Sequence, residues 1–75
     1  MVYLYFEDSN GDFRFVCKCE EEEVGAQITE YIHSINPNFK IYYMRSWADE
    51  KGGITYDIGS HAEFFHTYTG LLADR

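Results

Sequence analysis

The densest group of side chains with potential chemistry lies near the C-terminus, where two carboxylates and two imidazoles fall within ten residues: Asp57, His61, Glu63 and His66. A metal site needs two or three such ligands to converge on one point. His61 and His66 are five positions apart, whereas an i, i+4 spacing would align two ligands on a helix face. Metal-dependent catalysis by Asp57, His61 and His66 is therefore the weaker interpretation.

The stronger interpretation of this stretch is structural. Gly59 should end a strand, and Ser60 with Glu63 matches a capping box, in which each side chain binds an unpaired backbone N–H. The pattern predicts a short helical turn through Phe64 and Phe65, whose rings would close one end of the core. We expect no catalytic residue, metal or cofactor.

The two cysteines, Cys17 and Cys19, have little chemical context. They lack a second ligand pair for zinc, and the sequence places no base beside either thiol. On a strand both point to the same side, a poor geometry for a mutual disulfide. We interpret them as reduced, small apolar fillers of a cytoplasmic protein.

Composition limits the possible functions. The chain has 75 residues, 19% of them aromatic, and a net charge of −7. Nucleic-acid backbone binding requires clustered Lys and Arg, so a nucleic-acid partner is not expected, whereas a basic partner or mimicry of nucleic acid suits the charge. The N-terminus lacks the features of a signal peptide, and no apolar run reaches the ~20 residues that span a bilayer, so we expect no membrane association.

The first half of the chain predicts a hairpin followed by a helix. Residues 2–6 and 13–19 alternate in polarity around Asn10 and Gly11, the strongest short hairpin signal. The acidic run at residues 20–23 suits the first turn of a helix, and Pro37 should end that helix near Asn36. Its predicted apolar stripe is Val24, Ile28, Tyr31, Ile32 and Ile35.

The second half predicts strands at 39–47 and 54–58, joined by a polar turn that contains Gly52 and Gly53. The expected fold is α+β: a single ββαββ domain over residues 1–75, with a four-stranded antiparallel sheet in the order 2-1-3-4. One helix covers one face, and a short helical turn follows the last strand. Residues 67–75 should be loosely held, although Leu71 and Leu72 could dock.

One helix leaves the other sheet face uncovered. Period-2 alternation directs seven residues toward the helix: Val2, Leu4, Phe6, Phe13, Phe15, Ile54 and Ile58. The reverse face carries Tyr3, Tyr5, Arg14, Lys18 and Thr55. The third strand adds either Tyr43, Arg45 and Trp47 or Tyr42 and Met44, since the sequence does not fix its register. Tyr, Trp and Arg are enriched at binding hot spots, so the predicted interaction surface is Tyr3, Tyr5, Arg14, Tyr43, Arg45 and Trp47.

Three motifs resemble a group of small uncharacterised proteins carried by phages and prophages of Gram-positive bacteria. They are LYFEDSNG at residues 4–11, YYxRxW at 42–47 and DIGSHxEFF at 57–65. The resemblance covers nearly the whole chain and implies an accessory protein of a bacterial cytoplasm that binds a host or phage protein. The group has no assigned activity, so the resemblance assigns no site residue.

These observations favour a non-enzymatic protein-interaction module, a homodimer formed through its aromatic sheet face. The alternative is an acidic inhibitor or nucleic-acid mimic that acts on a host defence or nucleic-acid enzyme. It requires the carboxylates of residues 20–23, Asp49 and Glu50 to form one continuous stripe.

Overall fold

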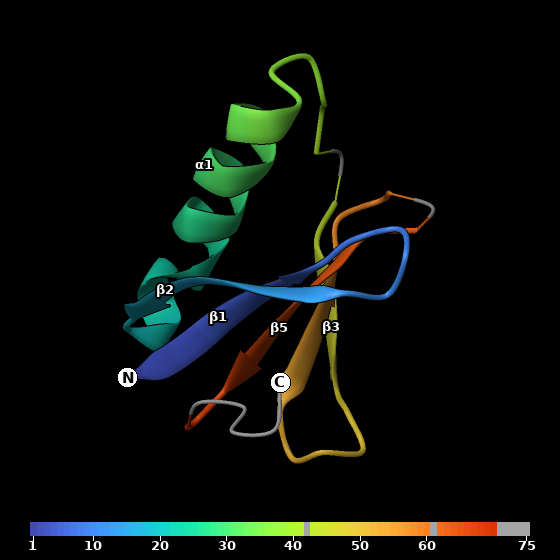
Figure 1. The fold of residues 1–75 in the computed structure, drawn as a ribbon. Coiled ribbons are helices and arrows are strands. Elements are labelled where there is room, and N and C mark those ends of the chain that lie inside the picture. Colours follow the sequence, from blue (N-terminus) through green and yellow to red (C-terminus); the bar gives the residue numbers. More distant parts are fainter. Residues whose placement is uncertain (42, 61, 71–75) are drawn as a thin grey trace.

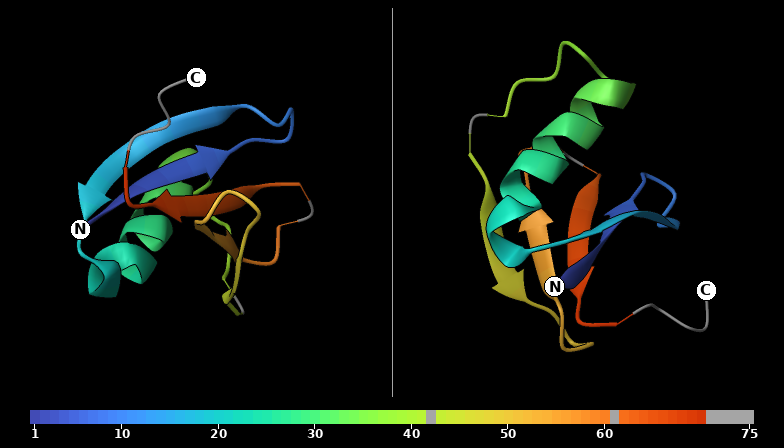
Figure 2. Two further views of the ribbon diagram at one scale, coloured as in Figure 1. Left: turned by 90° about the horizontal axis from the view of Figure 1, so that it is seen from below. Right: turned by 90° about the vertical axis from the view of Figure 1, so that its left-hand side faces the viewer.

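A computed structural model of the chain describes residues 1–41, 43–60 and 62–70. Along the chain lie β1 (Val2–Glu7), β2 (Phe13–Cys19), a 3₁₀ turn (Glu21–Glu23), α1 (Val24–Ile35), β3 (Arg45–Ala48), β4 (Ile54–Asp57) and β5 (Phe64–Tyr68). The strands form one antiparallel sheet in the order β2-β1-β5-β4-β3. Helix α1 lies against one face of this twisted sheet (Figures 1 and 2). The predicted α+β class, with a helix on an antiparallel sheet, is confirmed.

The predicted four-strand count and the 2-1-3-4 order are wrong, because Phe64–Tyr68 form a fifth strand instead of a helical turn. This strand, β5, pairs with β1 on one side and β4 on the other, and His66 lies opposite both Tyr5 and Thr55. The Ser60 hydroxyl donates to Glu63 Oε1 at 2.9 Å, a bond between two side chains, whereas the predicted capping box joins each side chain to a backbone N–H. Two sheet neighbours outweigh this local helix signal.

The end of β5 also corrects the expected loose tail. Thr67 and Tyr68 are buried in the sheet, although the sequence predicted that residues 67–75 would be loosely held. The predicted docking of Leu71 and Leu72 lies outside the described residues. β5 thus occupies the middle of the sheet, where its backbone is paired on both sides.

Helix α1 is bounded much as predicted. The Glu20 N–H donates to Glu23 Oε1 at 3.1 Å in the 3₁₀ turn that precedes it, and the Asn36 N–H closes its last turn on the Ile32 carbonyl at 2.8 Å. Val24, Ile28 and Ile32 are buried against the sheet. Ile35, predicted for the same stripe, is 51% exposed, because it lies in the last turn. No helix among the described residues combines the length and apolar character needed to cross a membrane.

A β-bulge in the first hairpin changes which side chains face α1. The β1–β2 register shifts between Leu4 and Tyr5, so that Cys17 lies opposite Leu4 while Phe15 lies opposite Tyr5. The extra residue on β2 is Val16, and such an insertion reverses the facing of everything beyond it. Phe13 and Phe15 therefore lie on the face away from α1. Their predicted place in the core is wrong.

The same bulge moves Arg14. It lies opposite Phe6, a core residue, and hence on the helix side of the sheet rather than beside Tyr3 and Tyr5. Its guanidinium is exposed and lies 3.7 Å from Asp8. The predicted membership of Arg14 in the uncovered face is thus wrong.

The core lies between α1 and the sheet. Leu4, Ile28, Ile58 and Phe65 are fully buried there, and each such side chain contributes about 1.5–3 kcal/mol by leaving water. Val16, Cys17, Phe39 and Tyr56 pack around this centre half-buried. The strand predicted over 39–47 pairs only at Arg45–Ala48. Before it, Phe39 turns back on the helix end through its N–H to the Asn36 carbonyl at 3.0 Å.

Candidate functional site

The face of the sheet away from α1 is termed the open face. Strand register assigns its members, since residues directly opposite one another share a face. They are Tyr3, Tyr5, Glu7, Phe13, Phe15, Lys18, Arg45, Trp47, Thr55, Asp57, Phe64, His66 and Tyr68. The register of β3 is therefore settled in favour of Arg45 and Trp47. Tyr42, of the alternative register, lies outside the described residues.

The middle of the open face is filled by its own aromatic rings. The Tyr5 ring lies between Phe15 and Tyr68, at centroid distances of 5.6 Å and 6.0 Å. The His66 ring stacks on Phe13 at 4.6 Å with an interplanar angle of 21°. Tyr5, His66 and Tyr68 are only 6–7% exposed. These four side chains, Tyr5, Phe13, His66 and Tyr68, are termed the central cluster.

His66 carries a polar chain through the central cluster. Its Nε2 lies 2.7 Å from Glu7 Oε1, and its Nδ1 lies 3.1 Å from Thr55 Oγ1. With a proton on Nε2, the ring donates to Glu7 and accepts from the Thr55 hydroxyl. Carboxylate, imidazole and hydroxyl thus follow the order of a nucleophile relay. Thr55 is only 6% exposed, and the chain of bonds joins β1, β5 and β4.

The turn between β3 and β4 closes over one side of this cluster. Asp49 Oδ1 accepts the backbone N–H groups of Lys51 at 2.9 Å and Gly53 at 2.8 Å, and its Oδ2 accepts the Tyr68 hydroxyl at 3.1 Å. A Cβ on Gly53 would collide with the Thr67 carbonyl and the Tyr68 ring. Only glycine permits so close an approach of the turn to β5.

These bonds also set the charge of Asp49. Burial opposes its ionisation, but the N–H of Gly53, the Tyr68 hydroxyl and the N–H of Lys51 outweigh burial and lower the pKa of the Asp49 carboxyl. Hydrogen bonds to the ionised form have this effect generally. Asp49 is therefore a carboxylate at neutral pH, and it lies 4.0 Å from His66 Nδ1.

The outer edge of the open face is different. Tyr43 and Trp47 are each 47% exposed, and the Arg45 side chain between them is 67% exposed. Arg45 binds Asp57 at 3.0 Å, and its guanidinium carbon lies 5.1 Å from the centre of the Tyr43 ring. These three residues, Tyr43, Arg45 and Trp47, are termed the β3 margin. In the described part of the chain, β3 pairs only with β4, so its other backbone edge is open.

Asp57 anchors this margin to the sheet. The Gly59 N–H donates to its Oδ1 at 2.9 Å, and this bond, together with that from Arg45, lowers the pKa of the Asp57 carboxyl against the opposing effect of burial. Gly59 has φ +92°, a conformation that suits glycine. The bond to Asp57 raises the pKa of the Arg45 guanidinium in turn.

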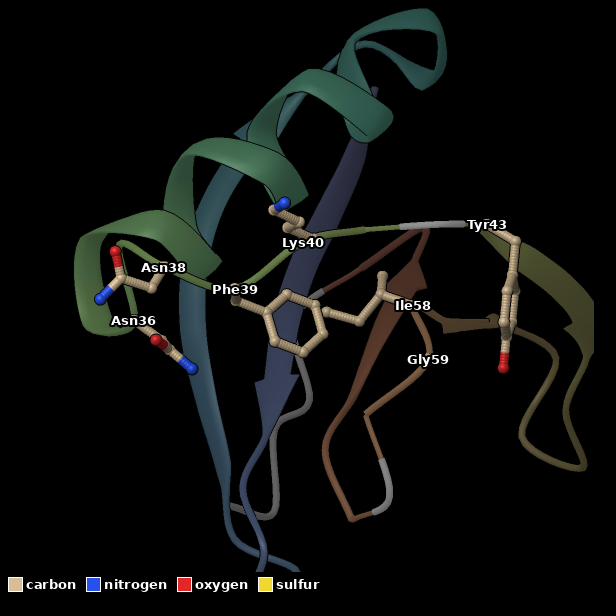
Figure 3. A pocket seen from close by; sticks show the side chains of 7 residues that line it. All are labelled: Asn36, Asn38, Phe39, Lys40, Tyr43, Ile58 and Gly59. Carbon is tan, nitrogen blue, oxygen red and sulfur yellow. The ribbon is translucent and has the colours of Figure 1, made fainter.

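A cavity of about 580 Å³ adjoins the β3 margin at Tyr43. Figure 3 shows the Phe39 ring directed at Ile58, while the Tyr43 ring stands apart near Gly59. The Asn36 and Asn38 side chains and Lys40 complete its lining. Its walls combine amide groups, an ammonium group and aromatic rings. The cavity thus lies between the β3 margin, at Tyr43, and the C-terminal end of α1, at Asn36.

The residues singled out in the sequence are thus dispersed. Tyr3 is half-buried on the open face with Lys18 Nζ 5.3 Å above its ring. Asp57 binds Arg45, Glu63 binds Ser60 and His66 binds Glu7, while His61 lies outside the described residues. No group of three or more potential metal ligands occurs within the described ranges.

The cysteines are unpaired thiols at the core side of β2. Cys19 is buried, and burial, followed by the neighbouring Cys17, raises the pKa of its thiol to about 11. Cys17 Sγ donates to Gln27 Oε1 at 3.7 Å. A thiol with so high a pKa is a poor nucleophile at neutral pH.

Comparison of the chain with protein-family models, with curated proteins and with solved structures finds no match. Two features of the described residues carry the functional argument. One is the contrast between the filled central cluster and the exposed β3 margin. The other is the polar chain through His66. Its members Glu7 and Thr55 were not predicted from the sequence, since Glu7 lies 59 positions from His66.

Proposed function

We propose that the chain is a non-enzymatic protein-interaction module that forms a homodimer by pairing β3 edge to edge with β3 of a second copy. The observation that carries this proposal is the exposure of every β3 residue on a strand that pairs with β4 alone in the described chain. An open strand edge with exposed aromatics is a template for another strand. Following the sequence resemblance, we further propose a phage or prophage accessory role in a bacterial cytoplasm.

Packing in the central cluster reduces the number of predicted interface residues that a partner could contact. Tyr5 is 6% exposed and packed among Phe13, Phe15 and Tyr68, so a partner would find little of it to contact. The β3 margin, in contrast, keeps about half of its aromatic surface in water. Of the six predicted interface residues, Tyr43, Arg45 and Trp47 are therefore the ones that we assign to the interface.

The sequence of β3 suits pairing with itself. In an antiparallel pair about a two-fold axis through Ser46, Arg45 of one copy lies opposite Trp47 of the partner subunit. The contact between Arg45 and Trp47 then occurs twice, as an isologous interface requires. Each Arg45 guanidinium can lie over a Trp47 indole ring. A domain of this size buries only ~60% of its unfolded surface, so the added burial would also stabilise each fold.

The alternative, an acidic mimic, requires the carboxylates of residues 20–23, Asp49 and Glu50 to form one continuous exposed stripe. Glu20–Glu23 are exposed, but the Asp49 side chain is only 15% exposed because it binds Tyr68 and its own turn. One carboxylate of the required stripe is therefore engaged within the fold, which favours the dimer proposal.

Trp47 is the only tryptophan of the chain, so its fluorescence reports directly on the proposed interface. On dilution from high to low micromolar concentration, the emission should shift to longer wavelength as the indole enters water, and sedimentation velocity should show a dimer becoming a monomer. A wild-type chain that remains monomeric throughout this range contradicts the dimer proposal.

The matched variants are Trp47→Glu and Phe15→Glu. Phe15 is a comparable exposed aromatic, at 51%, on β2 at the opposite edge of the sheet. Trp47→Glu should be a folded monomer by circular dichroism and sedimentation, whereas Phe15→Glu should remain a dimer. The reverse pattern would move the interface to the β2 edge.

A further inference from the structure

A second cavity lies between the β3–β4 turn and the central cluster, with a volume of about 210 Å³. Its walls include the rings of Phe13, His66 and Tyr68, and its rim consists of Asp49, Glu50 and Lys51. It lies on the open face but does not include any residue of the β3 margin. Its chemistry is thus independent of the proposed dimer.

The aromatic walls favour a cation. Phe13 stacks on His66 at 4.6 Å, and His66 is nearly parallel to Tyr68 at 6.3 Å with an interplanar angle of 15°. Ring faces carry partial negative charge and attract ammonium groups within about 6 Å of the centroid. The faces of Phe13 and His66 that stack on each other are covered, so the ring face that remains for an ammonium group is the outer face of Phe13.

The charges of the rim favour the same sign of ligand. Asp49 is held ionised by its hydrogen bonds to the turn and to Tyr68, and burial does not overcome them. Glu50 is exposed beside it, and Glu7 Oε1 lies 2.7 Å from His66 Nε2 at the edge of the imidazole ring. An anionic ligand in the cavity would meet the carboxylates of Asp49 and Glu50, whereas a cation would be attracted by them.

The chain already places one of its own ammonium groups at this site. Lys51 Nζ lies 5.6 Å from the centroid of the Phe13 ring, within the range of a cation–π contact. Lys51 is exposed and its side chain is a flexible four-carbon stem, so it can leave without disturbing the backbone of the turn. Lys51 thus marks which chemical group the cavity accepts.

We propose that this cavity is a binding site for alkylammonium groups and that Lys51 is its displaceable intramolecular occupant. The ligand is either the ammonium group of a lysine side chain on a basic protein or a small quaternary amine. Both share a positive head that the free face of the Phe13 ring and the Asp49 carboxylate would attract. A volume of about 210 Å³ accommodates such a head group but not a nucleotide.

The test is titration of the full chain with tetramethylammonium chloride, followed by ¹H–¹⁵N NMR at constant ionic strength with sodium chloride as the reference. Saturable shifts are expected at the amides of residues 13, 55, 66 and 68. A parallel titration with N-acetyl-lysine methylamide distinguishes the two sources. Saturation by both probes indicates a lysine side chain, and saturation by tetramethylammonium alone indicates a quaternary amine.

Two lysine variants make the test specific. Lys51→Met removes the resident ammonium and keeps the length of the side chain, so it should tighten tetramethylammonium binding about two- to fivefold, the worth of an exposed cation–π contact. Lys18→Met is the control, because Lys18 Nζ makes a similar contact, 5.3 Å above Tyr3, outside this cavity. It should leave the affinity unchanged.

The proposal is overturned if neither the wild type nor Lys51→Met shows saturable shifts at these amides. It is also overturned if Lys18→Met changes the affinity as much as Lys51→Met does. Phe13→Leu, which keeps an apolar side chain but removes the ring face, should abolish the binding gained in Lys51→Met. Retention of that binding would likewise refute the role of the Phe13 ring.

Discussion

The central cluster and the β3 margin occupy the same face of one sheet, and both are built from aromatic and charged residues. In the central cluster, the rings pack on one another, His66 binds Glu7 and Thr55, and Tyr68 binds Asp49. In the β3 margin, Tyr43 and Trp47 are half in water and one backbone edge of β3 is open in the described structure. Residue type therefore does not distinguish a binding surface from a second core. The number of neighbouring strands does, because β5 is central and β3 is at the edge.

The largest effect that this comparison predicts is on stability at the central cluster. Tyr5→Ala should lower the free energy of unfolding by about 3–5 kcal/mol, as large buried aromatic truncations do, because Tyr5 contacts Phe13, Phe15 and Tyr68. Urea denaturation would measure the change. A loss as small as that of an exposed residue would mean that the cluster is open after all.

Gly53→Ala should cost about 1–3 kcal/mol, the range for overpacking, because its Cβ would meet the Thr67 carbonyl and the Tyr68 ring. The turn would have to lift away from β5, breaking the bond from Tyr68 to Asp49. Thermal denaturation provides the measurement. Gly70→Ala is the matched control, since a Cβ there meets nothing within 4 Å, and it should be neutral.

Acid should weaken both regions through their carboxylates. The folded-state pKa values of Asp49 and Asp57 are lowered, so the unfolded chain binds more protons near pH 4, and stability rises with pH there. The contribution is fully present above the unfolded pKa of about 3.9 and is lost as the pH falls through the folded values. Urea midpoints measured between neutral pH and pH 3 should therefore fall with acid, and Asp57→Asn should flatten that fall.

The smallest predicted effect on stability is at the β3 margin. In the monomer, Trp47→Ala should change the free energy of unfolding by no more than about 0.5 kcal/mol, as surface substitutions generally do. Measurement at a concentration below dimerisation isolates this value. Destabilisation as large as that of Tyr5→Ala would place Trp47 in a core rather than at an interface, and the contrast between the two regions would fail.

Local patterns in the sequence were sufficient to predict much of the fold. The hairpin about Gly11, the stripe of Val24, Ile28 and Ile32, and the end of the helix at Asn36 depend on neighbours in the chain, and the structure confirms them. The bulge at Val16 was missed because a single extra residue leaves no mark in an alternating strand. As a result, Phe13 and Phe15 were assigned to the wrong face.

The strand β5 and the site around His66 were missed for a related reason. Ser60 and Glu63 carry a helix-start signal, and their side chains do bind each other, yet Phe64–Tyr68 are drawn into the sheet by β1 and β4. Because the prediction did not include β5, it could not place His66 beside Glu7 on β1 and Thr55 on β4. These contacts depend on the register between distant strands, which short-range periodicity does not encode.

The central place of β5 has a consequence for how the chain folds. β1 and β2 can pair as soon as they are made, and so can β3 and β4, but in the described sheet these hairpins are joined only through β5. The sheet thus remains in two separate pieces during synthesis until residues 64–68 have left the ribosome. Closing it requires contacts between sequence positions some sixty residues apart, such as Tyr5 with His66, and such long-range contacts slow folding. The last of the described strands to be made is thus the one that joins the two hairpins.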